Sequence, residues 1–208
     1  AAVSIPLAIG LGLLAVRYRN GWVDKLISGL ALASTSFPEF FIGYLLVYFF
    51  AVKWQIFPGI STVYDGMPFL VRMQAIALPA AVLTLVVLAH MMRMTRAAII
   101  NLLASPYIEM AILKGVPRRK IILRHALFNA IGPIVNVIAL NLAWLVGGVV
   151  IVEQIFSYPG LAKLMIEAVL LRDMPLVQAC AMIFCATYIV LIFIADMATI
   201  LSNPRLRH

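Results

Sequence analysis

Long runs of apolar residues divide this chain into segments of membrane-spanning length. A helix needs about 20 mainly apolar residues to cross about 30 Å of hydrocarbon, whereas a strand of a membrane barrel alternates apolar and polar positions over about ten residues. The runs here are continuously apolar and too long for such strands, so the pattern predicts an all-α, polytopic helical membrane protein. Five stretches are expected to span or nearly span the membrane: Ala1–Val16, Leu26–Val52, Ile76–Met92, Ala130–Val152 and Leu176–Leu201.

The composition also indicates burial in lipid. Of the 208 residues, 64% are hydrophobic and only 12% are charged, whereas soluble domains are about 45–50% apolar and about 25% charged. Cys180 and Cys185 lie in one apolar run without the spacing of a zinc or disulfide motif. We interpret both cysteines as small side chains that face the membrane.

The net charge is +8, and the basic residues that produce it are unevenly distributed among the connections between the spans. Twelve basic residues fall on the first and third connections and the C-terminal tail, against four on the other connections. The positive-inside rule therefore predicts that these two connections and the C-terminus are cytoplasmic. This distribution argues against a nucleic-acid partner, which would require a basic patch on one face. The twelve are Arg17, Arg19, Lys25, Arg93, Arg96, Lys114, Arg118, Arg119, Lys120, Arg124, Arg205 and Arg207.

The first apolar stretch has only 16 residues and no charged segment before it, unlike a secretory signal. Five spans with a cytoplasmic C-terminus place Ala1 outside the cell. We therefore expect residues 1–208 to form a single transmembrane domain within a longer protein of six spans, the first span here being partial.

The third connection, from Arg93 to about Asn129, is too long for a simple link between helices. Ser105 and Pro106 are typical of an N-cap and a first helical position, and Gly115 is typical of the position after a helix end. The sequence thus predicts a short helix over Pro106–Lys114. A separately capped helix of this kind can dock in a partner's groove or rest on anionic lipid. The residues of the helix do not by themselves distinguish these two roles.

Glu109-Met110-Ala111 with Gly115 resembles the EAA loop of ABC-importer permeases, and further segments resemble the peptide/nickel permease family in particular. Met110 replaces one alanine of that pattern, and Asn203 replaces an aspartate. Glu39 stands where small polar residues are usual, which bears on the substrate. The further segments are Ser36-Phe37-Pro38 with Phe40 and Gly43, Leu123–Leu127 with Asn129-Ala130 and Pro133, Glu153 with Phe156–Leu161, Arg172-Asp173 with Pro175 and Gln178, and Asn203–Arg205.

The resemblance implies a pathway subunit of an ATP-driven importer in the bacterial or archaeal inner membrane. Its implied partners are a second homologous permease, two ATPase subunits and an external substrate-binding protein, and the cargo is peptide or nickel. The chain has no G-x-x-x-x-G-K-[ST] motif, so ATP and Mg²⁺ belong to the ATPases, and we expect no cofactor or catalytic residue here. The residues expected to couple to the ATPases are Tyr107, Glu109, Met110, Ala111, Lys114, Gly115 and Arg118.

Ionisable residues within spans are functional candidates because they are costly there. Glu39 and the adjacent Pro38 are candidates to line the pathway, where Glu39 would meet a peptide amino group or a metal cation; the alternative is a structural carboxylate within a broken helix. Gly147 and Gly148 permit close helix approach and either line the pathway or seal an interface.

The remaining candidates have structural or external roles. Asp196 is expected to form an ion pair with Arg93 and Arg96, which lie at a similar depth. An external gate or binding-protein face is expected at Glu153, Phe156 and Tyr158.

The histidine, cysteine and acidic residues of the chain do not have the spacing that is typical of metal ligands. An intramembrane enzyme is disfavoured because H-E-x-x-H and G-x-S-x-G are both absent. A membrane scaffold that docks a cytoplasmic partner without transport remains an alternative.

Overall fold

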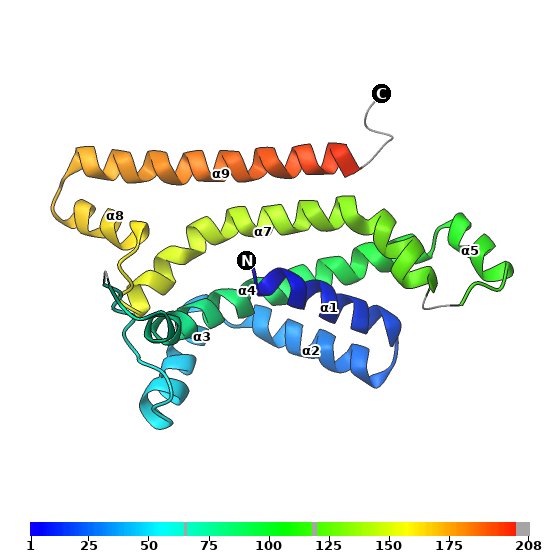
Figure 1. Cartoon of the computed structure of the whole chain (residues 1–208), viewed down its shortest axis with the longest axis horizontal. Helices are drawn as coiled ribbons and strands as arrows, with labels where there is room; N and C mark the ends of the chain where they lie inside the picture. The colour runs from blue at the N-terminus through cyan, green and yellow to red at the C-terminus, as the bar shows by residue number, and fades with distance from the viewer. Residues whose placement is uncertain (65, 118–119, 203–208) are drawn as a thin grey trace. The chain divides into compact units, whose positions relative to one another are not determined.

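A computed structural model describes residues 1–64, 66–117 and 120–202 (Figure 1). Within these residues the secondary structure is helical and contains no strand, which confirms the all-α prediction. The predictions for Arg118 and for the C-terminal motif at Asn203 lie outside the described residues. The chain forms two compact units, each built from segments far apart in the sequence.

Unit 1 contains residues 1–36, 87–142 and the described part of 191–208. In it α1 (Ser4–Arg17) and α2 (Trp22–Ser36) lie side by side (Figure 1). Its other elements are the end of α4 (Phe69–Leu103), α5 (Pro106–Leu113), the π-helical η2 (Ile121–Ala126), the first part of α7 (Leu127–Ile155) and the end of α9 (Met174–Ser202). Its apolar core is centred on Val16, Ile99, Ile122, Ala126, Ala130 and Ile134.

Unit 2 contains residues 37–86 and 143–190. Its elements are α3 (Glu39–Leu46), the π-helical η1 (Val47–Lys53), the start of α4, the end of α7, α8 (Leu161–Leu170) and the start of α9. The core is centred on Leu78, Val82, Val152 and Phe156.

The connection between η1 and α4 is anchored to the helices of unit 2 through Ser61. This residue is fully buried. Its backbone N–H donates to the Phe156 carbonyl at 2.8 Å, and its hydroxyl donates to the Ala75 carbonyl at 2.6 Å. The connection is therefore held against both α7 and α4.

Three helical stretches in the described residues are long and apolar enough to cross a membrane: Phe69–Leu103, Ile121–Ile155 and Met174–Met197. They contain or overlap the third, fourth and fifth predicted spans. The first predicted span corresponds to α1, which has 14 residues and is shorter than a full span. The second, predicted as one stretch over Leu26–Val52, is instead two helical segments, Trp22–Ser36 and Glu39–Lys53, with a break between them.

The break between these two segments has a local cause at Pro38. A proline disfavours helical geometry at the residue before it and lacks the N–H that would continue the helix. The hydroxyls of Thr35 and Ser36 both donate to the Leu32 carbonyl, at 2.9 and 2.8 Å, and thereby satisfy the end of α2. Pro38 then takes the N-cap position of α3 with extended backbone.

The third predicted connection is shorter in the structure than in the sequence analysis. The helix α4 continues eleven residues beyond the predicted span end at Met92 and finishes at Leu103. The run from Arg93 to Leu103 has no glycine or proline, so nothing in its backbone chemistry ends the helix at the first arginine.

Candidate functional site

The short helix predicted in the long connection is present as α5, over Pro106–Leu113. Ser105 has the extended backbone of an N-cap, and Pro106 takes the first helical position, as predicted. The Ser105 hydroxyl, however, donates to the carbonyl of Leu102 rather than accepting from the start of α5. The hydroxyl therefore joins α5 to the end of α4.

The C-terminal end of α5 is fixed by Gly115. Gly115 has φ +72°, and its N–H donates to the Ile112 carbonyl at 2.9 Å. The N–H of Val116 donates to the Ala111 carbonyl at 3.1 Å. These two bonds form a complete Schellman motif, in which the residue after the helix adopts a left-handed conformation that glycine favours.

The helix α5 presents most of its surface to solvent. Ile108 is buried, whereas Met110 and Leu113 are 55% and 75% exposed. Glu109 in the first turn and Lys114 at the C-cap are also exposed. A helix of only eight residues that leaves large apolar side chains uncovered is typical of a docking element.

Tyr107 contacts the beginning of α7 rather than pointing freely away from the chain. Its hydroxyl donates to the His125 carbonyl at 3.4 Å and accepts from Asn129 Nδ2 at 3.1 Å. Asn129 Nδ2 also donates to the His125 carbonyl, at 2.8 Å. This polar contact joins α5 to η2 and α7.

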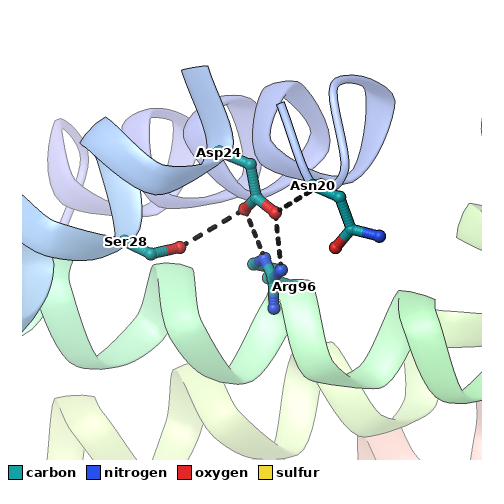
Figure 2. A network of polar contacts seen from close by, with 4 residues as sticks. All are labelled: Asn20, Asp24, Ser28 and Arg96. Atoms are coloured by element: carbon teal, nitrogen blue, oxygen red, sulfur yellow. Dashed lines mark hydrogen bonds and ion pairs between the residues drawn. The ribbon is translucent and has the colours of Figure 1, made fainter. Parts of the chain in front are cut away.

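A second polar network lies where α2 packs against α4 (Figure 2). The Arg96 guanidinium donates from Nε to Asp24 Oδ1 and from a terminal nitrogen to Oδ2, both at 2.8 Å. The Asn20 N–H and the Ser28 hydroxyl also donate to this carboxylate, at 3.0 and 3.3 Å. The Asp24 side chain is only 6% exposed. Four hydrogen bonds thus satisfy one buried carboxylate.

This network corrects the predicted partner of Arg96. The sequence predicts an ion pair of Asp196 with Arg93 and Arg96, but Arg96 forms its ion pair with Asp24. In the described residues Asp196 and Arg93 are both exposed, and neither takes part in an ion pair. Asp24 was missed because it stands in a connection dominated by Arg17, Arg19 and Lys25, although an acidic residue in the first turn of a helix was a signal for it.

The structure brings two of the predicted pathway residues together in unit 2. Glu39 occupies the first turn of α3, and a Cβ on Gly148 of α7 would lie 3.3 Å from both carboxylate oxygens of Glu39. Glu39 Oε1 is buried and has no hydrogen-bond partner among the described residues. Glycine at 148 therefore makes room for a carboxylate whose inner oxygen is unsatisfied.

The other two predicted pathway residues lie apart from this contact. Pro38 is exposed at the break before α3. Gly147 lines a largely apolar groove of about 550 Å³ in unit 2, together with Trp144, Met165 and Tyr188. Gly147 and Gly148 thus face different surroundings.

Two of the three residues predicted at an external face are buried. Phe156 is fully buried, Glu153 is 7% exposed and Tyr158 is half-buried. Glu153 Oε2 accepts from the Lys163 N–H at 3.0 Å, in the first turn of α8. Because Glu153 satisfies a free N–H of α8 and Phe156 packs in the core, contacts within the protein replace the external role predicted for these two residues.

Gly160 makes this capping contact possible. A Cβ at this position would overlap the Glu153 carboxylate. Replacing Glu153 by leucine leaves the Lys163 N–H unsatisfied, and we expect it to destabilise the protein by about 1–3 kcal/mol. Gly160→Ala should have a similar effect by displacing the carboxylate.

Thermal unfolding of the full-length protein in detergent measures this effect. We expect the midpoint to fall by about 2–10 °C for either variant, and the double variant to be no worse than the more affected single variant. Gln154→Leu, at an exposed neighbour, is the matched control. Additive losses in the double variant would contradict a shared contact.

Among the described residues, no group of three His, Cys, Asp or Glu side chains is arranged to hold a metal ion. His90 lies with Arg93 and Arg96 beside a groove of about 350 Å³ in unit 1.

Comparison with known proteins gives a match over nearly the whole chain. The family described as "Binding-protein-dependent transport system inner membrane component" matches residues 5–208. A "Probable peptide ABC transporter permease protein y4tP" of Sinorhizobium fredii is 31% identical over 99% of this chain and 66% of its own length. The "Glutathione transport system permease protein GsiC" is 32% identical in Pectobacterium atrosepticum, over 100% of this chain and 65% of the relative. The Escherichia coli K12 protein of that name is also 32% identical, over 99% and 64%. The chain thus spans about two thirds of the length of these relatives.

Proposed function

Since the chain belongs to the family of binding-protein-dependent transport system inner membrane components, we propose that it forms the transmembrane pathway of a peptide-type ABC importer. The importer would move its cargo from an external binding protein to the cytoplasm by alternating access. ATP hydrolysis would take place on separate ATPase subunits, and a second homologous permease would complete the pathway.

The observation that carries this proposal is the surface of α5. The helix is held at both ends, by Ser105 and Gly115, yet it leaves Met110 and Leu113 uncovered. Defined ends and an uncovered apolar face suit insertion into a rigid protein cleft. In this role Glu109 and Lys114 would form ion pairs at the rim, and Ala111 would allow close approach.

The proposed topology follows from the distribution of basic residues. Arg17 ends α1 and Arg19 lies in the turn that follows it, and the α5 region carries Lys114 and Lys120. Both regions are placed on the cytoplasmic side by the positive-inside rule, where an ATPase is accessible. The C-terminus would be cytoplasmic as well.

Reconstitution of the complete transporter tests the function. The full-length protein, the second permease and the two ATPases would be placed in liposomes with the binding protein. We expect ATP-dependent uptake of short peptides, absent without ATP or binding protein. Stable complex formation without uptake of any peptide or of nickel would favour the scaffold function instead.

The cargo we propose is a short peptide. The names of two relatives refer to peptide and to glutathione, which is itself a tripeptide. The unsatisfied oxygen of Glu39 supports this choice, because a carboxylate of this kind can accept hydrogen bonds from a peptide's ammonium group.

Glu39→Gln tests the contact with the ammonium group. A hydrogen bond between charged groups contributes about 1.5–3 kcal/mol, so we expect at least about tenfold slower uptake of a peptide with a free amino group. Uptake of the same peptide with an acetylated amino group should change much less. Glu167→Gln, at an exposed position of α8, is the control. Equal losses for both peptides would contradict the contact.

A further inference from the structure

The contact between α5 and α7 consists of an apolar part and a polar part. The apolar part lies where α5 contacts η2, and each of these elements carries a buried isoleucine, Ile108 on α5 and Ile121 on η2. The polar part is the set of hydrogen bonds among Tyr107, the His125 carbonyl and Asn129. Apolar contacts hold two elements together without fixing their rotation, whereas hydrogen bonds are directional. The polar part therefore sets the orientation of α5 relative to the start of α7.

Asn129 lies at a weak point of α7. Pro133 is inside this helix, four residues beyond Asn129. Proline has no N–H, so the backbone carbonyl of Asn129 lacks its usual helical partner, and the proline ring is crowded against it. Helices bend most readily at such a position. The Asn129 side chain thus connects α5 to the turn at which α7 is least constrained.

The segment just before Asn129 is also irregular. The six residues of η2 are π-helical and lead directly into α7 at Leu127. Short π-helical turns within helices are often found at functional sites. The Tyr107 hydroxyl contacts the carbonyl of His125, which belongs to this turn. A displacement of α5 would therefore act on α7 between the π-helical turn and the proline.

We propose that Tyr107 and Asn129 are positioning residues that transmit the movement of α5 to α7, and that α7 bends at Asn129–Pro133 in response. This inference rests on the proposed function, because the movement of α5 would come from the ATPases. The helix α7 continues to Gly148 beside Glu39. The link would thus connect the ATPase contact to the helix that lines the proposed pathway. Coupling between two distant sites is carried by rigid elements, such as helices, that switch between two discrete arrangements.

The test uses variants that remove the polar part and keep the apolar part. Tyr107→Phe removes only the hydroxyl, and Asn129→Leu removes the amide at similar volume. In the reconstituted full-length transporter we expect both variants to retain their ATPases on purification. The amount of peptide transported per ATP hydrolysed should fall about fivefold or more. Tyr18→Phe is the matched control, because Tyr18 is similarly exposed and its hydroxyl has no hydrogen bond in the described part of the chain.

The double variant Tyr107→Phe with Asn129→Leu should be no worse than the more affected single variant, because both changes break the same link. A lower yield of complex with an unchanged ratio of transport to hydrolysis would overturn the inference and leave a purely structural contact. If the wild-type protein itself fails to retain ATPases, the proposed function fails, and this inference fails with it.

Discussion

Replacing Gly115 by valine should reduce ATP-driven uptake by about 5- to 30-fold, which corresponds to a cost of about 1–2 kcal/mol. Gly115 has φ +72°, a conformation that a β-branched residue rarely adopts. Nothing lies within 4 Å of a Cβ at this position, so the cost comes from the backbone and not from a clash. Valine should open the Schellman motif and change the direction in which the chain leaves α5.

Gly66→Val is a closely matched control for this prediction. Gly66 has φ +85°, and its Cβ position is also open. The same substitution therefore imposes a similar backbone strain, but in the connection between η1 and α4. We expect uptake to remain close to wild type in Gly66→Val. Equal losses of uptake in the two variants would show that strain alone, rather than the geometry of α5, limits transport.

Removing the guanidinium of Arg96 should cause a large loss of stability. In Arg96→Met, the Asp24 carboxylate stays buried and keeps only its bonds from Asn20 and Ser28 (Figure 2). Removing one member of a buried ion pair costs about 3–5 kcal/mol. Arg96 is 27% exposed, so we expect about 2–3 kcal/mol here because solvent screens part of the interaction.

The midpoint of thermal unfolding in detergent measures this loss. For a domain of this size we expect it to fall by roughly 5–10 °C. Arg93→Met is the control, because Arg93 lies on the same helix but is exposed and has no ion pair in the described residues. Adding Asp24→Asn to Arg96→Met should restore part of the stability, since no buried charge is then left unpaired. Similar midpoints for Arg96→Met and Arg93→Met would contradict the assigned role.

The sequence was most informative where structure depends on neighbouring residues. The start of α5 at Pro106 and the left-handed Gly115 were both predicted, because capping follows from the residue types at a few adjacent positions. The span predicted over Ile76–Met92 lies within α4, which continues as a helix for eleven residues beyond Met92. A helix can continue beyond the bilayer when its residues favour helical geometry.

Contacts between distant residues were less predictable. Asp24 and Arg96 are 72 positions apart, and periodicity does not indicate which basic residue an acidic residue will meet. The sequence predicts an external position for Glu153 because it lies at the outer end of the fourth predicted span. In the structure the Glu153 carboxylate instead accepts a hydrogen bond from the Lys163 N–H at the start of α8. The sequence suggests Glu39 and Gly148 as separate pathway candidates, with no sign that they are neighbours. In the structure the two residues lie next to each other.

The most direct test of the central claim is photo-crosslinking from α5. A benzophenone amino acid would replace Met110, which is 55% exposed, in the full-length transporter. The same label at Leu170, which is 77% exposed on α8, would serve as the control. We predict an adduct with the ATPase subunit from position 110 and none from position 170. Adducts from position 110 with lipid alone would contradict the account, because α5 would then rest on the membrane surface instead of docking in a cleft.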